Sequence, residues 1–128
     1  MLKLESLTVR YGNFTAVDGV SLEVGDSEII TLVGPTGCGK SSVLRSVAGF
    51  ETPAAGEIQI GNQVITKSAP LPPERRNIGL VFQDFALFPH LNVADNIGFR
   101  VKDTSLVEFW LDQLALNALR DKRPETLS

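Results

Sequence analysis

The stretch LVGPTGCGKSSVL, residues 32–44, determines how the rest of the chain is interpreted. An apolar run gives way to a loop rich in glycine, which is followed by Lys40 and two serines. The apolar run 28–34, EIITLVG, is typical of a strand that is buried on both faces. Beyond the loop, apolar residues recur at helical spacing and stop at Gly49. The stretch therefore predicts a strand, a tight loop and a helix.

The loop has the pattern G-x-x-x-x-G-K-S, which is typical of a phosphate-binding loop. Gly34, Gly37 and Gly39 allow the backbone to curl and to direct its N–H groups inward. The following helix adds its free N–H groups and the positive end of its dipole. Lys40 supplies a mobile charge for the terminal phosphates, and Ser41 offers a hydroxyl to Mg²⁺. The alternative is a chance glycine-rich turn, which the flanking strand and helix patterns disfavour.

The first third of the chain and residues 56–65 carry β patterns. Residues 2–11 alternate with a slip after Leu4, and they are predicted to pair with residues 16–26 through a turn at Gly12-Asn13. The segment 56–65 predicts two short strands about a Gly-Asn turn.

Further along, 77–82 (NIGLVF) predicts a second buried strand. Asn92, with Asp95 three residues later, predicts a helix N-cap. Residues 105–114 predict an amphipathic helix, with one apolar side formed by Leu106, Val107, Trp110, Leu111 and Leu114.

Bulk composition narrows the function classes. The chain has 128 residues, 43% of them hydrophobic, a net charge of −3 and a pI near 5.1, so it is not expected to bind nucleic acid. The single cysteine fits a reducing compartment. The start has no signal-peptide pattern, and no apolar run reaches the ~18 residues that a membrane span needs. We therefore expect a cytoplasmic protein.

With Tyr11, the loop and residues 81–97 (VFQDFALFPHLNVADNI) in view, the chain resembles the ATP-binding subunits of ABC transporters along its whole length. The resemblance implies an α/β fold: a P-loop, RecA-like core with an N-terminal antiparallel β subdomain and the start of a helical subdomain. The expected parts are antiparallel β and the first core strand at 1–33 and 56–66, P-loop and helix at 34–49, core strand and Q-loop at 77–90, and helical subdomain at 92–128.

The resemblance also implies the site and its cofactors, ATP and Mg²⁺. Tyr11 would stack on the adenine, with a role in capping the hairpin as the less favoured alternative. Val17 would pack beside the nucleotide, although it could equally fill a strand core. Gln83 would ligate Mg²⁺ with Ser41 and sense the attacking water and the γ-phosphate, unless it is only a polar residue ending a strand. Lys40 would act in catalysis. The remaining expected ATP contacts are Gly34, Pro35, Thr36, Gly37, Cys38, Gly39, Ser41 and Ser42.

The aromatic segment after Gln83 has two interpretations. In the family this region meets the membrane permease, which would make Phe85, Leu87 and Phe88 contact residues. Alternatively, these side chains attach the helical subdomain to the core. We expect His90, the only histidine, to have a local role near the turn after Pro89.

The implied function is the ATPase subunit of an ABC importer. The sequence of residues 71–99 most resembles the ATP-binding subunits of ferric iron importers, then those of polyamine importers, then those of sulfate or other small-solute importers. The implied partners are permease subunits, a periplasmic binding protein and a second copy of the ATPase. The subunit would lie at the inner face of the plasma membrane through its permease.

The sequence ends at Leu127-Ser128, two residues into the family's signature motif. The Walker B aspartate, the catalytic glutamate and the switch histidine would follow that point, so these 128 residues are expected to bind ATP without turnover. Two alternatives are a non-catalytic nucleotide-binding or interaction fragment and a soluble ABC ATPase that has no permease.

Overall fold

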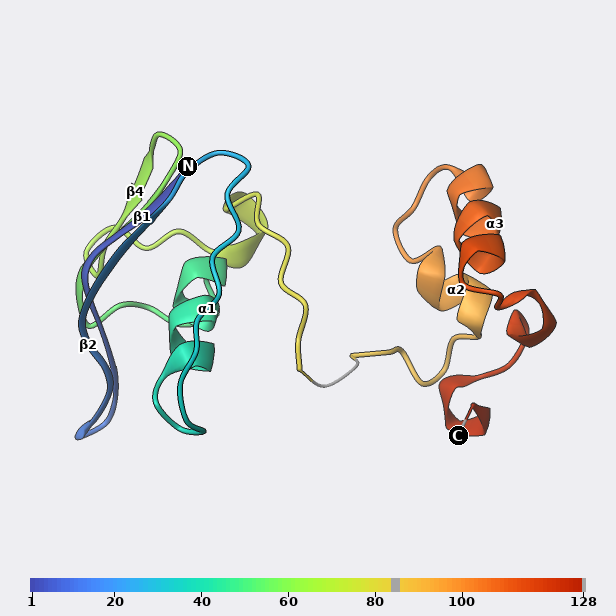
Figure 1. The fold of residues 1–128 in the computed structure, drawn as a ribbon, viewed down its shortest axis with the longest axis horizontal. Helices are drawn as coiled ribbons and strands as arrows, with labels where there is room; N and C mark the ends of the chain where they lie inside the picture. Colours follow the sequence, from blue (N-terminus) through green and yellow to red (C-terminus); the bar gives the residue numbers. More distant parts are fainter. Residues whose placement is uncertain (84–85, 128) are drawn as a thin grey trace. The chain divides into compact units, whose positions relative to one another are not determined.

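The chain folds into two compact units, Met1–Val81 and Phe82–Ser128 (Figure 1). The computed structural model describes residues 1–83 and 86–127. Each unit is described by itself.

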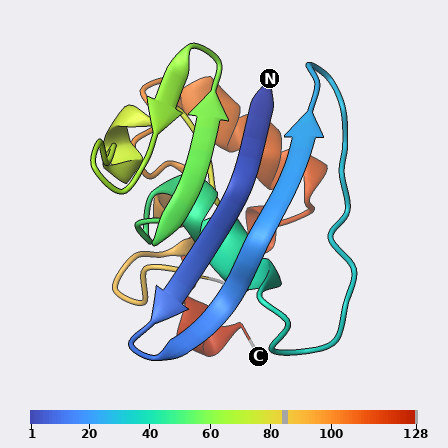
Figure 2. The same cartoon turned by 90° about the vertical axis from the view of Figure 1, so that its left-hand side faces the viewer.

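The first unit contains an antiparallel sheet of four strands in the order β2-β1-β3-β4 (Figure 2). The strands are β1 (Leu2–Tyr11), β2 (Phe14–Val24), β3 (Ala55–Ile60) and β4 (Gln63–Ile65). Tyr11 lies opposite Phe14, so the predicted ribbon with its turn at Gly12-Asn13 is confirmed. The predicted pair of short strands about Gly61-Asn62 is confirmed as well.

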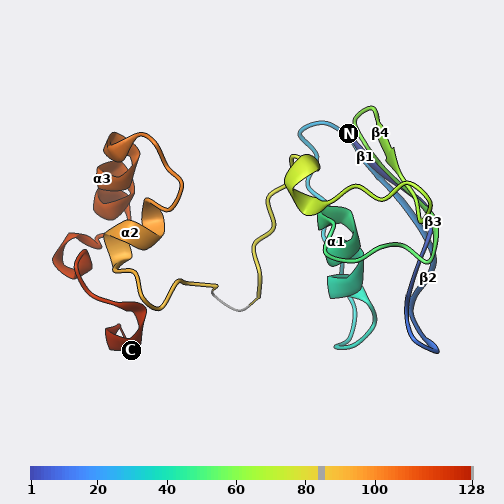
Figure 3. The ribbon, with the colours of Figure 1, turned by 180° about the vertical axis from the view of Figure 1, so that it is seen from behind.

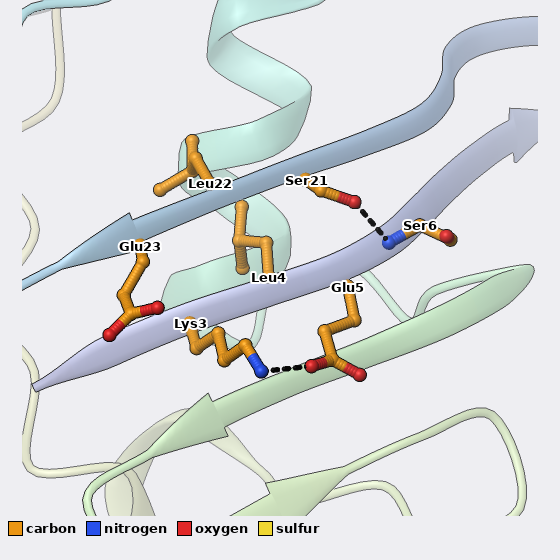
Figure 4. Close-up of a pocket in the computed structure, with 7 residues that line it drawn as sticks. All are labelled: Lys3, Leu4, Glu5, Ser6, Ser21, Leu22 and Glu23. Carbon is orange, nitrogen blue, oxygen red and sulfur yellow. Dashed lines mark hydrogen bonds and ion pairs between the residues drawn. The ribbon is translucent and has the colours of Figure 1, made fainter.

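A β-bulge explains the slip in the apolar pattern of β1. The pairing register shifts between Leu4 and Leu7, and Ser6 between them has a φ of 49°. The Ser6 N–H donates to the Ser21 hydroxyl of β2 at 2.9 Å, and this bond is visible in Figure 4. Because the bulge inserts one residue, Leu4 and Leu7 both reach the buried face of the sheet.

Helix α1 (Lys40–Ala48) packs against one face of the sheet (Figures 1 and 2). It ends at Gly49, which has a φ of 94°, so the predicted end is confirmed. The buried cluster between helix and sheet consists of Leu4, Leu7, Val9, Val17, Val43, Val47, Ile58 and Ile65.

A buried arginine caps the C-terminus of α1. Arg76, only 2% exposed, donates from Nη1 to the carbonyls of Ser46 at 2.5 Å and Val47 at 3.0 Å. Its Nε donates to the Leu71 carbonyl at 2.6 Å. Burial lowers the pKa of the Arg76 guanidinium. The charge therefore rests on helix-end carbonyls, where the dipole favours a cation.

The predicted buried strands at 28–34 and 77–82 are wrong for this structure. Neither segment is assigned to a strand or paired in the sheet that the described residues form. Ile29, Val33 and Val81 are 93%, 90% and 96% exposed. A parallel strand is stable only between hydrogen-bonded neighbours with both faces covered, and local apolarity cannot supply those neighbours.

The second unit is helical. Helices α2 (Val93–Ile97) and α3 (Thr104–Gln113) lie side by side (Figure 3), followed by the 3₁₀ turns η2 (Asn117–Leu119) and η3 (Pro124–Thr126). Asn92 accepts from the Asp95 N–H at 2.7 Å, which confirms the predicted N-cap. None of the helices in the described parts of the chain is both long enough and apolar enough to span a bilayer.

The predicted apolar side of α3 is only partly buried. Leu111 is fully buried and Val107 is intermediate, whereas Leu106, Trp110 and Leu114 are about half exposed. Within its unit α3 packs on the short helix α2, which is too small to cover the whole apolar face.

Candidate functional site

The glycine-rich loop and the start of α1 form one wall of a small cavity in the first unit. The cavity holds about 160 Å³ and reaches from the loop to the β1–β2 hairpin. Tyr11, at the end of β1, stands on its rim together with the loop residues that the sequence singled out. Its lining residues are Tyr11, Phe14, Ala16, Gly37, Gly39, Lys40, Ser41 and Ser42.

Two glycines of the loop have left-handed backbone angles but different surroundings. Gly39 has a φ of 97°, and a Cβ there would lie 2.3 Å from the Ala16 carbonyl oxygen of β2. Gly37 has a φ of 84°, and a Cβ there would meet nothing within 4 Å. The absence of a side chain at Gly39 therefore allows the loop to lie directly against the sheet, whereas Gly37 has open space beside it.

Helix α1 begins without a side-chain cap. Its N-cap residue is Gly39, and no side chain accepts from the N–H groups of its first turn. In contrast, α2 is capped by Asn92 and α3 by Asp103. The first turn of α1 also carries no acidic residue. The free N–H groups and the helix dipole are thus available to an anion at this end of the helix.

The ammonium group of Lys40 is folded over the loop. Its Nζ donates to the carbonyls of Gly34 at 2.8 Å and Pro35 at 2.7 Å, and it lies 3.5 Å from the sulfur of Cys38. No carboxylate among the described residues forms an ion pair with it. The charge is therefore held at the cavity by carbonyls, which a phosphate can replace as partners.

The hydroxyl of Tyr11 lies 3.1 Å from the hydroxyl of Ser42, so the phenol ring is tied to the first turn of α1. Tyr11 remains 46% exposed. Burial raises the pKa of Tyr11, the Glu51 carboxylate raises it further, and the Ser42 hydroxyl lowers it.

The sequence reasoning missed Phe14 as a residue that lines the cavity. Phe14 lies opposite Tyr11 in the hairpin and is 62% exposed. The signal was available, because an aromatic residue stood on each side of the Gly12-Asn13 turn. An exposed aromatic pair beside a phosphate loop offers flat surfaces to a nucleotide base.

Val17 lies behind the site. Its side chain is 5% exposed and belongs to the core cluster, so it fills the strand core, the alternative that the sequence left open. A Cβ on Gly39 would still lie 3.2 Å from the Val17 Cγ2, so Val17 supports the loop from beneath. Pro35, Thr36 and Cys38 are exposed loop residues.

The expected residues of the Q-loop region fall in the second unit. Gln83 is exposed, and its part in binding Mg²⁺ and water stays a prediction. Leu87 is 51% exposed. Phe88 is half-buried, with its ring 4.2 Å from that of Phe99, so it helps to hold its own unit together. Phe85 lies outside the described residues.

Phe88 is also anchored through its backbone, because its N–H donates to the Asn96 side chain at 2.9 Å and its carbonyl accepts from the same amide at 3.2 Å. The exposed His90 makes an edge contact with the Phe88 ring, which is a local role of the kind the sequence predicted.

The described features combine a glycine loop, an uncapped helix end with an adjacent lysine, and an aromatic rim, and such a combination defines a phosphate-loop nucleotide-binding protein. The chain matches the ABC transporter family over residues 17–128, and it belongs to that family.

Two curated relatives have a similar sequence over nearly the whole chain. The spermidine/putrescine import ATP-binding protein PotA of Pseudomonas aeruginosa is 44% identical over 96% of this chain and 33% of its own length. The sulfoquinovosyl glycerol transport ATP-binding protein SmoE of Agrobacterium fabrum is 42% identical over 99% of this chain and 37% of its own length. The chain thus spans about a third of the length of these relatives.

A solved structure shares the α/β fold. The ATP-binding cassette MJ0796, in a dimeric post-hydrolysis state bound to ADP and Pi, matches all of this chain and 63% of its own. The TM-score is 0.80 and the sequence identity is 26%.

Proposed function

We propose that this chain binds Mg-ATP in the cavity at the start of α1 and forms part of the ATP-binding subunit of an ABC importer. The observation that carries the proposal is the uncapped N-terminus of α1, which is enclosed by the glycine loop and supplied with the charge of Lys40. That arrangement suits a chain of phosphates, because N–H groups, a dipole and an ammonium group converge on one small space.

The residues present fit the nucleotide. Gly37 leaves open space on the cavity side of the loop, and the ammonium of Lys40 can exchange the Gly34 and Pro35 carbonyls for phosphate oxygens. Tyr11 and Phe14 would hold the base, and Ser42 would donate to a phosphate. Mg²⁺ supplies charge neutralisation on the phosphates, and the exposed hydroxyl of Ser41 is its expected ligand with Gln83.

Hydrolysis, solute and partners belong to the whole transporter. We propose that the whole transporter couples ATP hydrolysis to import, with permease subunits and a periplasmic binding protein as partners at the inner membrane face. Membership of the family and the import ATP-binding relatives support the coupling to import. The dimeric cassette structure supports a second ATPase copy. Of the ranked solutes, the relatives named for spermidine/putrescine favour polyamine. The relatives reported above give ferric iron, the first expectation, no support.

Isothermal calorimetry with Mg-ATP tests the proposal. We expect weak binding by the chain, loss of binding in Lys40→Ala, and no phosphate release, because, among the described residues, no carboxylate that could act as a base lines the cavity beside the loop. Lys67→Ala removes the same charge from an exposed loop and should bind like the unmodified chain.

The absence of any Mg-ATP heat from the folded chain would overturn the proposed binding. Steady phosphate release that Lys40→Ala abolishes would instead overturn the expectation that these residues bind without turnover.

A further inference from the structure

The hydroxyl groups of Tyr11 and Ser42 join the hairpin to the helix at the candidate site. Their oxygens lie 3.1 Å apart, although the two residues are 31 positions apart in the sequence. Tyr11 ends β1, and Ser42 lies in the first turn of α1. Both residues line the cavity, with Tyr11 about half exposed and Ser42 half-buried. The bond therefore connects the rim where a base would stack to the helix end where phosphates would bind.

The chemistry of the two hydroxyls decides which of them donates once a phosphate is bound. Each hydroxyl has one proton to donate and lone pairs that accept. Ionised phosphate oxygens accept, so a Ser42 hydroxyl that bonds a phosphate must direct its proton there. Its lone pairs then remain for the phenol of Tyr11, which is the more acidic of the two hydroxyls and thus the better donor. The order Tyr11 to Ser42 to phosphate satisfies all three groups.

We propose that Tyr11 is a positioning residue for phosphate binding, because its hydroxyl orients the Ser42 hydroxyl toward a nucleotide phosphate. This inference rests on the proposed function, since it gives Tyr11 a second role in the same site besides stacking on the base. The phenol donates to the Ser42 oxygen and leaves the Ser42 proton directed at the phosphate. Each bond in such a chain polarises the next, so the bond from Ser42 to the phosphate is strengthened as well.

The position of the phenol is set by the sheet. Tyr11 pairs with Phe14 across the hairpin, so its hydroxyl approaches α1 from a strand rather than from the glycine loop. The Ser42 side chain could otherwise turn among three staggered rotamers. A hydroxyl that is already held loses less freedom when a phosphate binds, which raises affinity. The expected gain is that of about one hydrogen bond, or roughly a factor of 2 to 10 in affinity.

A double-mutant cycle on the chain tests the inference, with Tyr11→Phe, Ser42→Ala and the double variant titrated with Mg-ATP by calorimetry. Tyr11→Phe keeps a flat ring for the base and removes only the hydroxyl, and it should weaken binding by about 2- to 10-fold. In the Ser42→Ala background the same change should have no further effect, because the phenol has lost the partner that it orients.

Two further variants separate positioning from a merely structural role. Ser42→Thr keeps a hydroxyl, so Tyr11→Phe should again weaken binding by about 2- to 10-fold in that background. Ser68→Ala is the matched control and should bind like the unmodified chain. The Ser68 hydroxyl lies 3.1 Å from the Thr66 hydroxyl in the same unit, and Ser68 does not line the cavity.

Urea unfolding without nucleotide gives the folded fraction of each variant, so that the affinities of folded chains are compared. A merely structural bond would lower the free energy of unfolding in Tyr11→Phe and leave the affinity of the folded chain unchanged.

Unchanged Mg-ATP affinity in folded Tyr11→Phe, or an equal loss with and without the Ser42 hydroxyl, would overturn the inference. The absence of a loss in the Ser42→Thr background would overturn it too. A failure of the unmodified chain to bind Mg-ATP would instead defeat the proposed function. One set of titrations therefore distinguishes the two failures.

Discussion

At the scale of single residues, the site depends on glycines that differ in what surrounds them. Gly37 and Gly39 both have positive φ angles, so both give the loop its curl. Only Gly39 also meets neighbouring backbone, at the Ala16 carbonyl. The sequence motif does not distinguish the two glycines, and only the contact of Gly39 with β2 in the folded structure shows that their roles differ. Conformational freedom and close approach are thus two separate requirements in one loop.

Alanine substitution at these two glycines separates the requirements. Gly37→Ala should reduce the free energy of unfolding by about 1–2 kcal/mol through its left-handed backbone alone. Gly39→Ala should lose a further ~2 kcal/mol or more, because its Cβ would lie 2.3 Å from a backbone oxygen. Urea denaturation without nucleotide measures both variants. Equal losses would show that the Ala16 contact does not constrain the loop.

At the scale of elements, the two ends of α1 differ in whether their free backbone groups have partners. Its N-terminus is left open beside the loop, while its C-terminus is closed by Gly49 and by the guanidinium of Arg76. A Cβ on Gly49 would lie 2.7 Å from the Arg76 Nε, so glycine is required there for packing as well as for its φ angle. Arg76 therefore fixes the end of the helix whose start is the proposed phosphate site.

Two adjacent arginines provide a matched test of this clamp. Arg76→Met removes charged hydrogen bonds to buried carbonyls and should lower the free energy of unfolding by about 2–3 kcal/mol. Arg75→Met alters an exposed neighbour and should change it by less than about 0.5 kcal/mol. Thermal and urea unfolding of both variants provide the measurement. Similar small effects in the two variants would rule out the clamp.

The sequence predicted those elements whose signals are local. The β1–β2 hairpin, the bulge after Leu4, the end of α1 at Gly49 and the Asn92 cap all depend on residues close together in the chain. The role of Arg76 was missed because its partners on α1 are about thirty residues away. In the site, the loop motif was readable, and Phe14 also carried a local signal, because it lies directly across the Gly12-Asn13 turn from Tyr11.

At the scale of the whole molecule, residues 1–83 and 86–127 contain one sheet, with α1 packed on it, and two apolar segments that lie outside that sheet. The antiparallel sheet forms because all four of its strands lie within the first 65 residues, where β1 and β2 form one hairpin and β3 and β4 form another. The segments 28–34 and 77–82 have the composition of core strands but lie outside the sheet. Leu32 and Ile78 pack against the core cluster, whereas Ile29, Val33 and Val81 are exposed. The apolar sequence of these segments alone does not predict pairing, because a central strand also needs neighbouring strands, which come from elsewhere in the chain.

Hydrogen exchange can determine whether these segments are strands in solution. Amides of residues 29–33 and 78–81 should exchange close to the rate of an unstructured peptide, because they are extended and outside the sheet. The central residues of β1, around the buried Leu4 and Leu7, should be protected and serve as the reference within the same sample. Mg-ATP should add protection in the loop at 34–42 without protecting 78–81, since its phosphates are proposed to contact the first turn of α1. Protection of both apolar segments before nucleotide is added would mean that they pair as strands, and the exposure described for Ile29, Val33 and Val81 would then be wrong.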